Sequence, residues 1–407
     1  IYKGLKPVYW CPHDETALAE AEIEYQDDPC TTVYVKFPMH DDCGKLAHVD
    51  QSKLFFVIWT TTIWTLPGNL AIALHPDESY ALVKAPNGET YIMAEALTEK
   101  VMGIGGFESF EILETHPGAF FENMLADHPF LPKTSRLLLA DYVTMDSGTG
   151  CVHTAPGFGA DDYQTCRRYG MDMVVPVNDQ GRHTDYAGKY EGMLVEESNP
   201  VILNDMKEAG SLFASEEIVH SYPHCWRCHQ PVIFRATDQW FVSMDKNDLR
   251  TQALKAINED VQWVPEWAKN RIGSMVAERP DWCISRQRSW GVPIPVFKCA
   301  KCGNTVATAE TFDAVIKLFE EKGSDAWFTE SPASYLPAGT ACEVCGCTDL
   351  VPESDILDVW WESGVSHTSV CKKRPGLRFP ADLYLEGSDQ HRGWFQASLL
   401  TSIGAYE

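Results

Sequence analysis

Three Cys-x-x-Cys pairs stand out among the fourteen cysteines of this 407-residue chain. Cys299 and Cys302 form one pair, and Cys342 and Cys345 form another beyond a linker that contains a predicted helix. Two such turns present four thiolates in the tetrahedral arrangement that zinc prefers. Because the sequence shows no secretory signal, we expect reduced thiols and metal binding rather than disulfides. The sequence therefore predicts a structural zinc, with buried free thiols as the alternative, and it leaves open whether Cys347 replaces Cys345.

The third pair, Cys225 and Cys228, needs two further ligands to hold a zinc ion. The nearest candidates are Cys11 and Asp14, which lie far away along the chain but have the same spacing. A carboxylate can complete a zinc site. The sequence thus predicts one structural zinc and allows a second, for which the alternative is a hydrogen-bonded turn without metal.

Four threonines and two tryptophans crowd the segment from Trp59 to Asn69. Thr60, Thr61 and Thr62 follow an apolar run that predicts a strand, so we expect them at the end of that strand. The four threonine hydroxyls beside the two tryptophans could line a small polar pocket and offer donors and acceptors to a ribose or a water molecule. Threonine also favours strands, so a plain strand edge is the simpler alternative.

Glycines and a proline between Gly148 and Tyr163 predict a tight loop, with His153 and two aspartates near its ends. A carboxylate of this loop, from Asp161 or Asp162, could bind an ammonium group through a charge-assisted hydrogen bond. The imidazole of His153 could orient a water molecule or act as a base. A single histidine more often has a structural role, and that alternative stays open from composition alone.

The net charge of −25 lowers the expectation of a nucleic-acid partner, because phosphate binding depends on Lys and Arg. Arg286, Arg288 and Lys298 nevertheless allow a local basic patch. No apolar run approaches the roughly 20 residues of a membrane helix. The chain length predicts about two to four domains.

Periodicity and punctuation by Gly, Pro and Asp predict the elements that must position these residues. Strand signals are dense in the first half of the chain, and helical spacing is more frequent in the second half. The expected strands cover residues 8–10, 32–37, 54–59, 80–83, 90–93 and 383–385. The expected helices cover residues 95–102, 247–257, 267–275 and 311–322, with another from residue 393 onward.

Six ordered stretches of the chain resemble isoleucyl-tRNA synthetases of the bacterial type. Residues 59–69, WTTTIWTLPGN, resemble the threonine-rich peptide WTTTPWTLPxN, and residues 148–163 resemble the loop GTGxVHxAPxxGxDDY. The stretch DVWWESG is close to DVWFDSG, and EGSDQHRGWF is close to the adenylate-binding EGxDQxRGWF. The other two similar stretches, at the two junctions of the inserted editing domain with the core, are residues 4–10 and 279–291.

Valyl and leucyl enzymes have TTRPET or TTRPDT where this chain has a third threonine and a second tryptophan, so the isoleucyl family is favoured. Ile63 departs from the usual Pro without removing a functional group. Asp14 stands where many relatives have Cys, which weakens the second zinc site. Trp361 and Glu362 replace Phe and Asp conservatively.

The resemblance implies an α/β multidomain fold. A strand-rich, β-barrel-like α+β editing domain is expected to be inserted in a partial Rossmann-type core, with small zinc-ribbon modules. The resemblance implies five divisions. They are linker strands with half of a zinc knuckle (1–37), the editing domain (38–205), a return segment with a knuckle and helices (206–295), a zinc-ribbon insertion (296–352) and the partial core (353–407).

The resemblance also implies the activity. The parent enzyme would ligate isoleucine to tRNA(Ile) with ATP and Mg²⁺, and this part would hydrolyse mischarged Val-tRNA(Ile). The implied editing residues are Thr60, Thr61, Thr62, Asn69, His153 and Asp162. The residues expected to hold amino acid and adenylate are Glu386, Gly387, Asp389, Gln390, Trp360 and Trp394, although core packing is an alternative for the two tryptophans.

The HIGH and KMSKS motifs that hold ATP do not occur in residues 1–407, so we expect this stretch alone not to activate isoleucine. The implied partners are tRNA(Ile) and aminoacyl esters of valine and isoleucine, in a monomeric cytoplasmic protein without a membrane segment. Two other functions stay open at this point: a noncatalytic tRNA-binding module and a zinc-dependent hydrolase.

Overall fold

The protein is described by a computed structural model that covers residues 1–405. The chain divides into two compact units. We call Leu5–Glu15 with Glu22–Asp238 the pocket unit, and Ile1–Gly4, Thr16–Ala21 and Gln239–Glu407 the C-terminal unit. The chain passes from one unit to the other four times: within β1 (Tyr2–Cys11), after Glu15, after Ala21 and within β13 (Ile233–Val242). Over residues 1–405, no helix has both the length and the apolar character to cross a bilayer.

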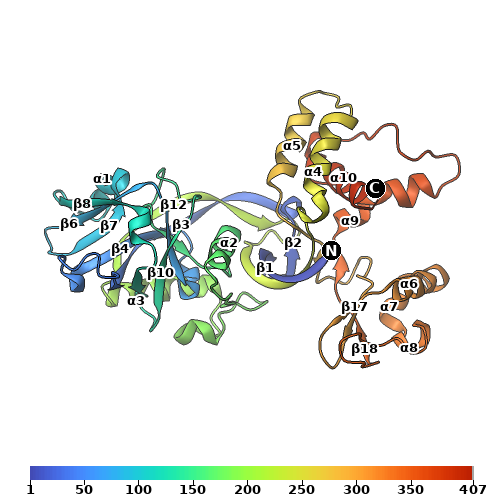
Figure 1. The fold of residues 1–407 in the computed structure, drawn as a ribbon, viewed down its shortest axis with the longest axis horizontal. Helices are drawn as coiled ribbons and strands as arrows, with labels where there is room; N and C mark the ends of the chain where they lie inside the picture. The colour runs from blue at the N-terminus through green and yellow to red at the C-terminus, as the bar shows by residue number, and fades with distance from the viewer. Residues whose placement is uncertain (406–407) are drawn as a thin grey trace. The chain divides into compact units, whose positions relative to one another are not determined.

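A ten-stranded mixed sheet forms the frame of the pocket unit (Figure 1). Its strand order is β12-β3-β9-β10-β5-β11-β4-β7-β6-β8. The strands are β12 (Leu212–Cys225), β3 (Ile23–Asp41), β9 (Leu125–Asp127), β10 (Thr134–Leu139), β5 (Ala71–Leu74), β11 (Val152–Thr154), β4 (Leu54–Thr60), β7 (Thr90–Ala94), β6 (Ser79–Lys84) and β8 (Glu111–Pro117). The predicted strand-rich unit is therefore confirmed.

The sheet closes on itself, because β3 pairs with β4 as well as with β9 and β12. Strands β3, β9, β10, β5, β11 and β4 thus form a ring in which every member has two neighbours. Strand β4 pairs in parallel with both β11 and β7, and β10 pairs in parallel with β5. A closed ring leaves these six strands without a free edge.

The core of the pocket unit explains the nearly continuous apolar runs. Strand β4 has four fully buried residues among seven, and β5 and β7 are buried throughout. Strands covered on both faces need apolar side chains at successive positions rather than at alternate ones. The largest fully buried side chains in this core include Phe37, Phe56, Tyr80, Tyr91 and Phe121.

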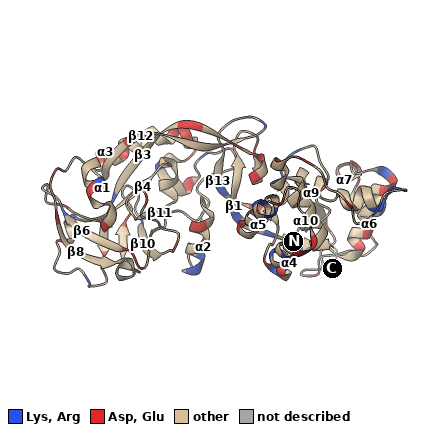
Figure 2. Cartoon of the chain, turned by 90° about the horizontal axis from the view of Figure 1, so that it is seen from above, with Lys and Arg blue, Asp and Glu red and all other residues tan. Residues whose placement is uncertain are grey.

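Three α-helices complete the pocket unit: α1 (Thr98–Ile104), α2 (Ala160–Arg168) and α3 (Val195–Glu208). Asp and Glu are prominent along β3 and β12, whereas Lys and Arg occur at the end of α2 (Figure 2). The local distribution of charge is therefore uneven, although the net charge is strongly negative.

The C-terminal unit is mainly helical. Helices α4 (Leu249–Lys255), α5 (Ala268–Glu278), α9 (Val359–Gly364) and α10 (Trp394–Ala405) contribute to one apolar core. A smaller module contains the sheet β17-β16-β18 with three helices against it (Figure 1). Its elements are β16 (Phe297–Cys299), β17 (Thr305–Val306), β18 (Leu350–Pro352), α6 (Ala309–Lys322), α7 (Ala326–Thr329) and α8 (Pro332–Tyr335). The remaining short strands are β2 (Thr16–Leu18), β14 (Trp282–Cys283), β15 (Ser285–Arg286) and β19 (Ile356–Leu357).

The structure confirms the helices expected near residues 247–257, 267–275, 311–322 and after 393. The strand expected over residues 383–385 is wrong, because this segment has no regular secondary structure. Leu383 and Leu385 are 76% and 78% exposed, and no strand of the described chain pairs with them. An apolar β-former does not make a strand without a neighbouring strand to accept its hydrogen bonds.

Gly150 provides a test of the packing between the β-ring and the loop that carries His153. Its φ is +73°, and an added Cβ would lie 2.4 Å from the Cβ of Ala94. Gly44 has a similar φ of +74° but nothing within 4 Å of an added Cβ. We expect Gly44→Ala to cost about 1–2 kcal/mol of stability through backbone strain, and Gly150→Ala to cost about 1–3 kcal/mol more through overpacking. Thermal unfolding of both variants checks this; equal losses would contradict the packing argument.

Candidate functional site

A cavity of about 310 Å³ lies in the pocket unit where the threonine-rich segment meets the loop before α2. Thr60, Thr61 and Thr62 line one side, and His153 and Asp162 come from the other segment. The two segments meet because β11 pairs in parallel with β4, with Val152 opposite Trp59. This pairing places residues that are about ninety positions apart in the sequence around the same cavity.

The threonine hydroxyls bind one another along the wall of the cavity. The Oγ1 of Thr62 lies 3.2 Å from that of Thr60 and 3.1 Å from that of Thr65. The hydroxyl of Thr65 donates to the carbonyl oxygen of Thr62 at 2.8 Å, at the start of a 3-10 helix over Ile63–Gly68. Thr65 also lines the cavity, in keeping with the four-threonine pattern, although the editing residues implied by the resemblance include only Thr60, Thr61 and Thr62. Its place in the same motif was the signal that could have identified it.

His153 is held as a neutral imidazole with a defined tautomer. Its Nδ1 accepts from the side-chain amide of Asn69 at 2.7 Å, and its Nε2 lies 3.0 Å from the Oγ1 of Thr65. Because the Thr65 hydroxyl donates to Thr62, the Nε2 of His153 must be the donor in the second bond. Burial, with a smaller contribution from the positive charge of Lys133, lowers the pKa of His153 to about 3. His153 is therefore a fixed wall with a neutral donor, and it has no free nitrogen with which to act as a base.

Asn69 lies behind His153 and does not line the cavity. Its side chain is fully buried, donates to the carbonyl oxygen of Ala71 at 2.8 Å, and accepts from the hydroxyl of Ser135. The resemblance implies that Asn69 is one of the editing residues. The structure places the amide where it orients the imidazole, so any influence on a ligand acts through His153.

Asp162 supplies the carboxylate of the cavity from the first turn of α2. Its Oδ2 accepts from the backbone N–H of Ala155 at 2.8 Å, and its Oδ1 lies 3.4 Å from the hydroxyl of Tyr142. Burial raises the pKa of Asp162 to about 6, and the neighbouring Asp161 adds to the increase. The helix N-terminus and the two donors favour the charged form. A partly desolvated carboxylate facing a cavity is suited to bind an organic cation.

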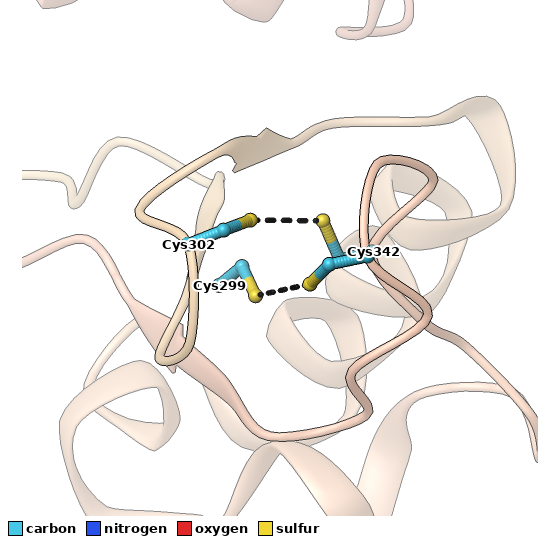
Figure 3. Close-up of side chains that lie close together, drawn as sticks. Cys299, Cys302 and Cys342 are labelled. Atoms are coloured by element: carbon cyan, nitrogen blue, oxygen red, sulfur yellow. Dashed lines mark hydrogen bonds between the residues drawn. The ribbon is translucent and has the colours of Figure 1, made fainter.

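The four cysteines of the first predicted metal site come together in the small module. Figure 3 labels three of them, Cys299, Cys302 and Cys342. The Sγ atoms of Cys299 and Cys345 lie 3.5 Å apart, and those of Cys302 and Cys342 lie 3.6 Å apart. A tetrahedral zinc with Zn–S bonds of about 2.3 Å requires sulfur atoms roughly 3.8 Å apart. The four sulfur atoms lie within 4.8 Å of one another and fit such an ion. Cys347 is not in this group, so the geometry favours Cys345 as the fourth ligand.

The second predicted set also comes together, at the ends of β1 and β12. The Sγ atoms of Cys11 and Cys228 are 3.5 Å apart, and the Sγ of Cys225 is 3.6 Å from a carboxylate oxygen of Asp14. All four ligand atoms lie within 4.8 Å of one another. Three thiolates and one carboxylate form an acceptable zinc set, so Asp14 is placed to act as the fourth ligand.

A model of the family "tRNA synthetases class I (I, L, M and V)" matches residues 1–407. The chain belongs to this class I tRNA synthetase family. It is 52% identical over 405 residues to the isoleucine–tRNA ligase of Caldicellulosiruptor saccharolyticus, with 99% of this chain and 44% of the relative covered. It is 53% identical over 406 residues to that of Kosmotoga olearia, with 99% and 43% covered.

The chain thus spans less than half of the length of these curated synthetases. A solved structure described as "The crystal structure of GlLeuRS-CP1" matches with a TM-score of 0.37 and 15% identity. It covers 46% of this chain and 99% of its own.

In the described part of the chain, the residues predicted to hold amino acid and adenylate do not line the cavity of about 310 Å³. Glu386, Gly387 and Asp389 are exposed, in and before a single 3-10 turn over Ser388–His391. The indole N–H of Trp394 donates to the carbonyl oxygen of Ser363 at 3.1 Å, and its ring stacks on Tyr384 with centroids 4.1 Å apart. Trp360 and Gln390 lie against Gly393, where an added Cβ would be 2.6 Å and 2.8 Å from their atoms.

The defined tautomer of His153 can be tested directly. In ¹⁵N-histidine-labelled protein, with the signal assigned by its loss in His153→Gln, we expect a neutral ring protonated at Nε2 from pH 8 down to at least pH 5. The reason is that burial lowers its pKa far below this range and Asn69 occupies Nδ1. Titration between pH 6 and 7 would contradict this description of the pocket.

Proposed function

We propose that the pocket unit hydrolyses the ester bond of valine wrongly attached to tRNA(Ile), as the editing site of an isoleucyl-tRNA synthetase. The main support is the gathering of Thr60, Thr61, Thr62, His153 and Asp162 around one cavity. The family and the isoleucine–tRNA ligase relatives support the choice of substrate. In the parent enzyme, ligation of isoleucine would use ATP and Mg²⁺, with residues 360–394 contributing to that separate site.

The need for a second site follows from the limits of hydrophobic selection. One methylene is worth only about 1–3 kcal/mol in a binding pocket, and isoleucine against valine in this enzyme class is the standard example. A hydrolytic pocket that admits valine but not isoleucine multiplies this selectivity. The neutral and rigidly held imidazole of His153 is suited to be the steric wall, because its position does not change with charge near neutral pH.

The proposed reaction assigns one task to each group. Asp162 would bind the α-ammonium group of the aminoacyl ester, and the hydroxyls of the threonine wall would orient the terminal ribose and a water molecule. Water attacks the ester carbonyl, the bond to the ribose oxygen breaks, and this oxygen receives the proton that water loses. An aminoacyl ester is already activated, so positioning can supply much of the rate without a covalent nucleophile.

None of the eight predicted metal ligands lines the cavity. Each set already offers four ligands, which suits a structural zinc rather than a catalytic ion with an open position. This arrangement favours metal-independent hydrolysis over a zinc-dependent hydrolase. When bound, zinc would cross-link each pair of turns and stabilise the local fold.

Replacement of Asp162 tests the proposed function. We expect Asp162→Ala to lower deacylation of Val-tRNA(Ile) at least about 100-fold, equivalent to about 2.7 kcal/mol, because the ammonium group loses its counter-ion. The matched control is Asp161→Asn, which changes an exposed carboxylate one position away and should retain the rate. Unchanged hydrolysis by Asp162→Ala would refute the assignment. Binding of tRNA by wild type without any hydrolysis would indicate a noncatalytic module.

The metal sites give a second prediction. We expect two zinc ions per chain, measured by elemental analysis, and one fewer in Cys302→Ser and in Cys225→Ser, each with a lower thermal midpoint. The control is Cys347→Ser, which removes a thiol outside the predicted set and should leave the zinc content unchanged. Zinc loss in the control but not in Cys302→Ser would overturn the ligand assignment.

A further inference from the structure

Tyr142 lies on the wall of the cavity but belongs to neither of the two motifs that identify the pocket. It follows β10, in the segment that leads to Gly148. Its hydroxyl is 3.4 Å from the Oδ1 of Asp162. It is the only side-chain hydroxyl of the described cavity lining with a hydrogen bond to this carboxylate.

The carboxylate needs such support because it is largely removed from water. Burial and the charge of Asp161 both favour the protonated, neutral form of Asp162. Two donors oppose this effect, one on each oxygen: the N–H of Ala155 on Oδ2 and the hydroxyl of Tyr142 on Oδ1. The thiol of Cys166, on the same helix, is the other titratable group that faces Asp162, and burial raises its pKa so that it stays uncharged.

The phenol is well placed for a fixed role. Its ring packs against the apolar cluster of Ala73, Ala140 and Val143, which lies beside β5 and β10. Burial and the charge of Asp162 raise the pKa of Tyr142, so the hydroxyl keeps its proton and remains a donor at all relevant pH values. A ring fixed by packing holds the hydroxyl at one position without further loss of side-chain entropy.

We propose that Tyr142 is a positioning residue that fixes Oδ1 of Asp162 and keeps the carboxylate ionised for the α-ammonium group of the aminoacyl ester. This inference rests on the proposed function and adds a residue to it. Tyr142 acts through Asp162 rather than on the reacting atoms. Its removal should therefore weaken substrate binding and alter the pH dependence more than the rate of the chemical step.

The test is the pH profile of Val-tRNA(Ile) deacylation by Tyr142→Phe, which keeps the packed ring and removes only the hydroxyl. Loss of one donor to the carboxylate raises the pKa of Asp162 further, so the acidic limb of the profile should move upward by about 0.5–1 pH unit. At pH 8, where the carboxylate is ionised in either protein, we expect KM to rise about threefold to tenfold and kcat to change less than about twofold.

The matched control is Tyr169→Phe. The hydroxyl of Tyr169 donates to Glu122 at 2.7 Å and accepts from the N–H of Leu139, and this residue does not line the cavity. The same chemical change there should leave both the acidic limb and KM at their wild-type values. Thermal midpoints of both variants show whether either change perturbs the fold.

A direct binding measurement avoids dependence on turnover. Valine joined by an amide bond to 3′-amino-3′-deoxyadenosine cannot be hydrolysed as an ester and retains the ammonium group. We expect Tyr142→Phe to bind it more weakly than wild type at every pH from 6 to 8, with a larger difference near pH 6, where more of the Asp162 carboxylate is protonated in the variant. Equal affinities of the two proteins across this range would overturn the proposal.

Asp162→Asn separates failure of this inference from failure of the proposed function. If Asp162→Asn still hydrolyses Val-tRNA(Ile) at the wild-type rate, the proposed function of the pocket is wrong. If Asp162→Asn is inactive but the acidic limb of Tyr142→Phe coincides with that of wild type, only the role of Tyr142 is wrong. A shifted limb in Tyr142→Phe together with an inactive Asp162→Asn supports both.

Discussion

The candidate site depends on one backbone interaction, the parallel pairing of β11 with β4. This pairing puts the end of the threonine-bearing strand beside the short strand that carries His153. Strand β11 has only three residues, so its position is secured by its neighbours in the closed ring rather than by its own length. The two glycines before it, Gly148 and Gly150, both have positive φ and form the turn that precedes β11. The ring therefore fixes the distance between the two halves of the pocket.

Around this frame, burial determines the chemistry of each ionisable group. Desolvation keeps His153 neutral and makes ionisation of Asp162 unfavourable. The hydrogen-bond partners of His153 suit a neutral imidazole, and those of Asp162 suit a charged carboxylate. The imidazole has one donor and one acceptor partner, whereas the carboxylate has two donors. The pocket thus contains a single anionic group in an otherwise neutral wall, which is the arrangement that selects a small organic cation.

The sequence predicted those features that depend on neighbouring residues in the chain. Buried strands such as β4 and β7 were recognisable from their apolar runs, and the three Cys-x-x-Cys pairs were recognisable as candidate metal ligands from their short spacing. That Cys11 and Asp14 join Cys225 and Cys228 had only weak support from the sequence. Features that depend on distant partners were not predictable. The strand expected at residues 383–385 lacks a neighbour in the described chain, Asn69 could not be placed behind His153, and Tyr142 has no local signal. The choice of Cys345 over Cys347 also required coordinates.

The hydrogen bonds of His153 have a consequence for a protein with so many thiolate ligands. A metal ion binds an imidazole through the lone pair of an unprotonated nitrogen. In His153 that lone pair, on Nδ1, is occupied by the amide of Asn69, and Nε2 carries the proton. We therefore expect the pocket to bind divalent metal ions only weakly, although a histidine and an aspartate are common metal ligands.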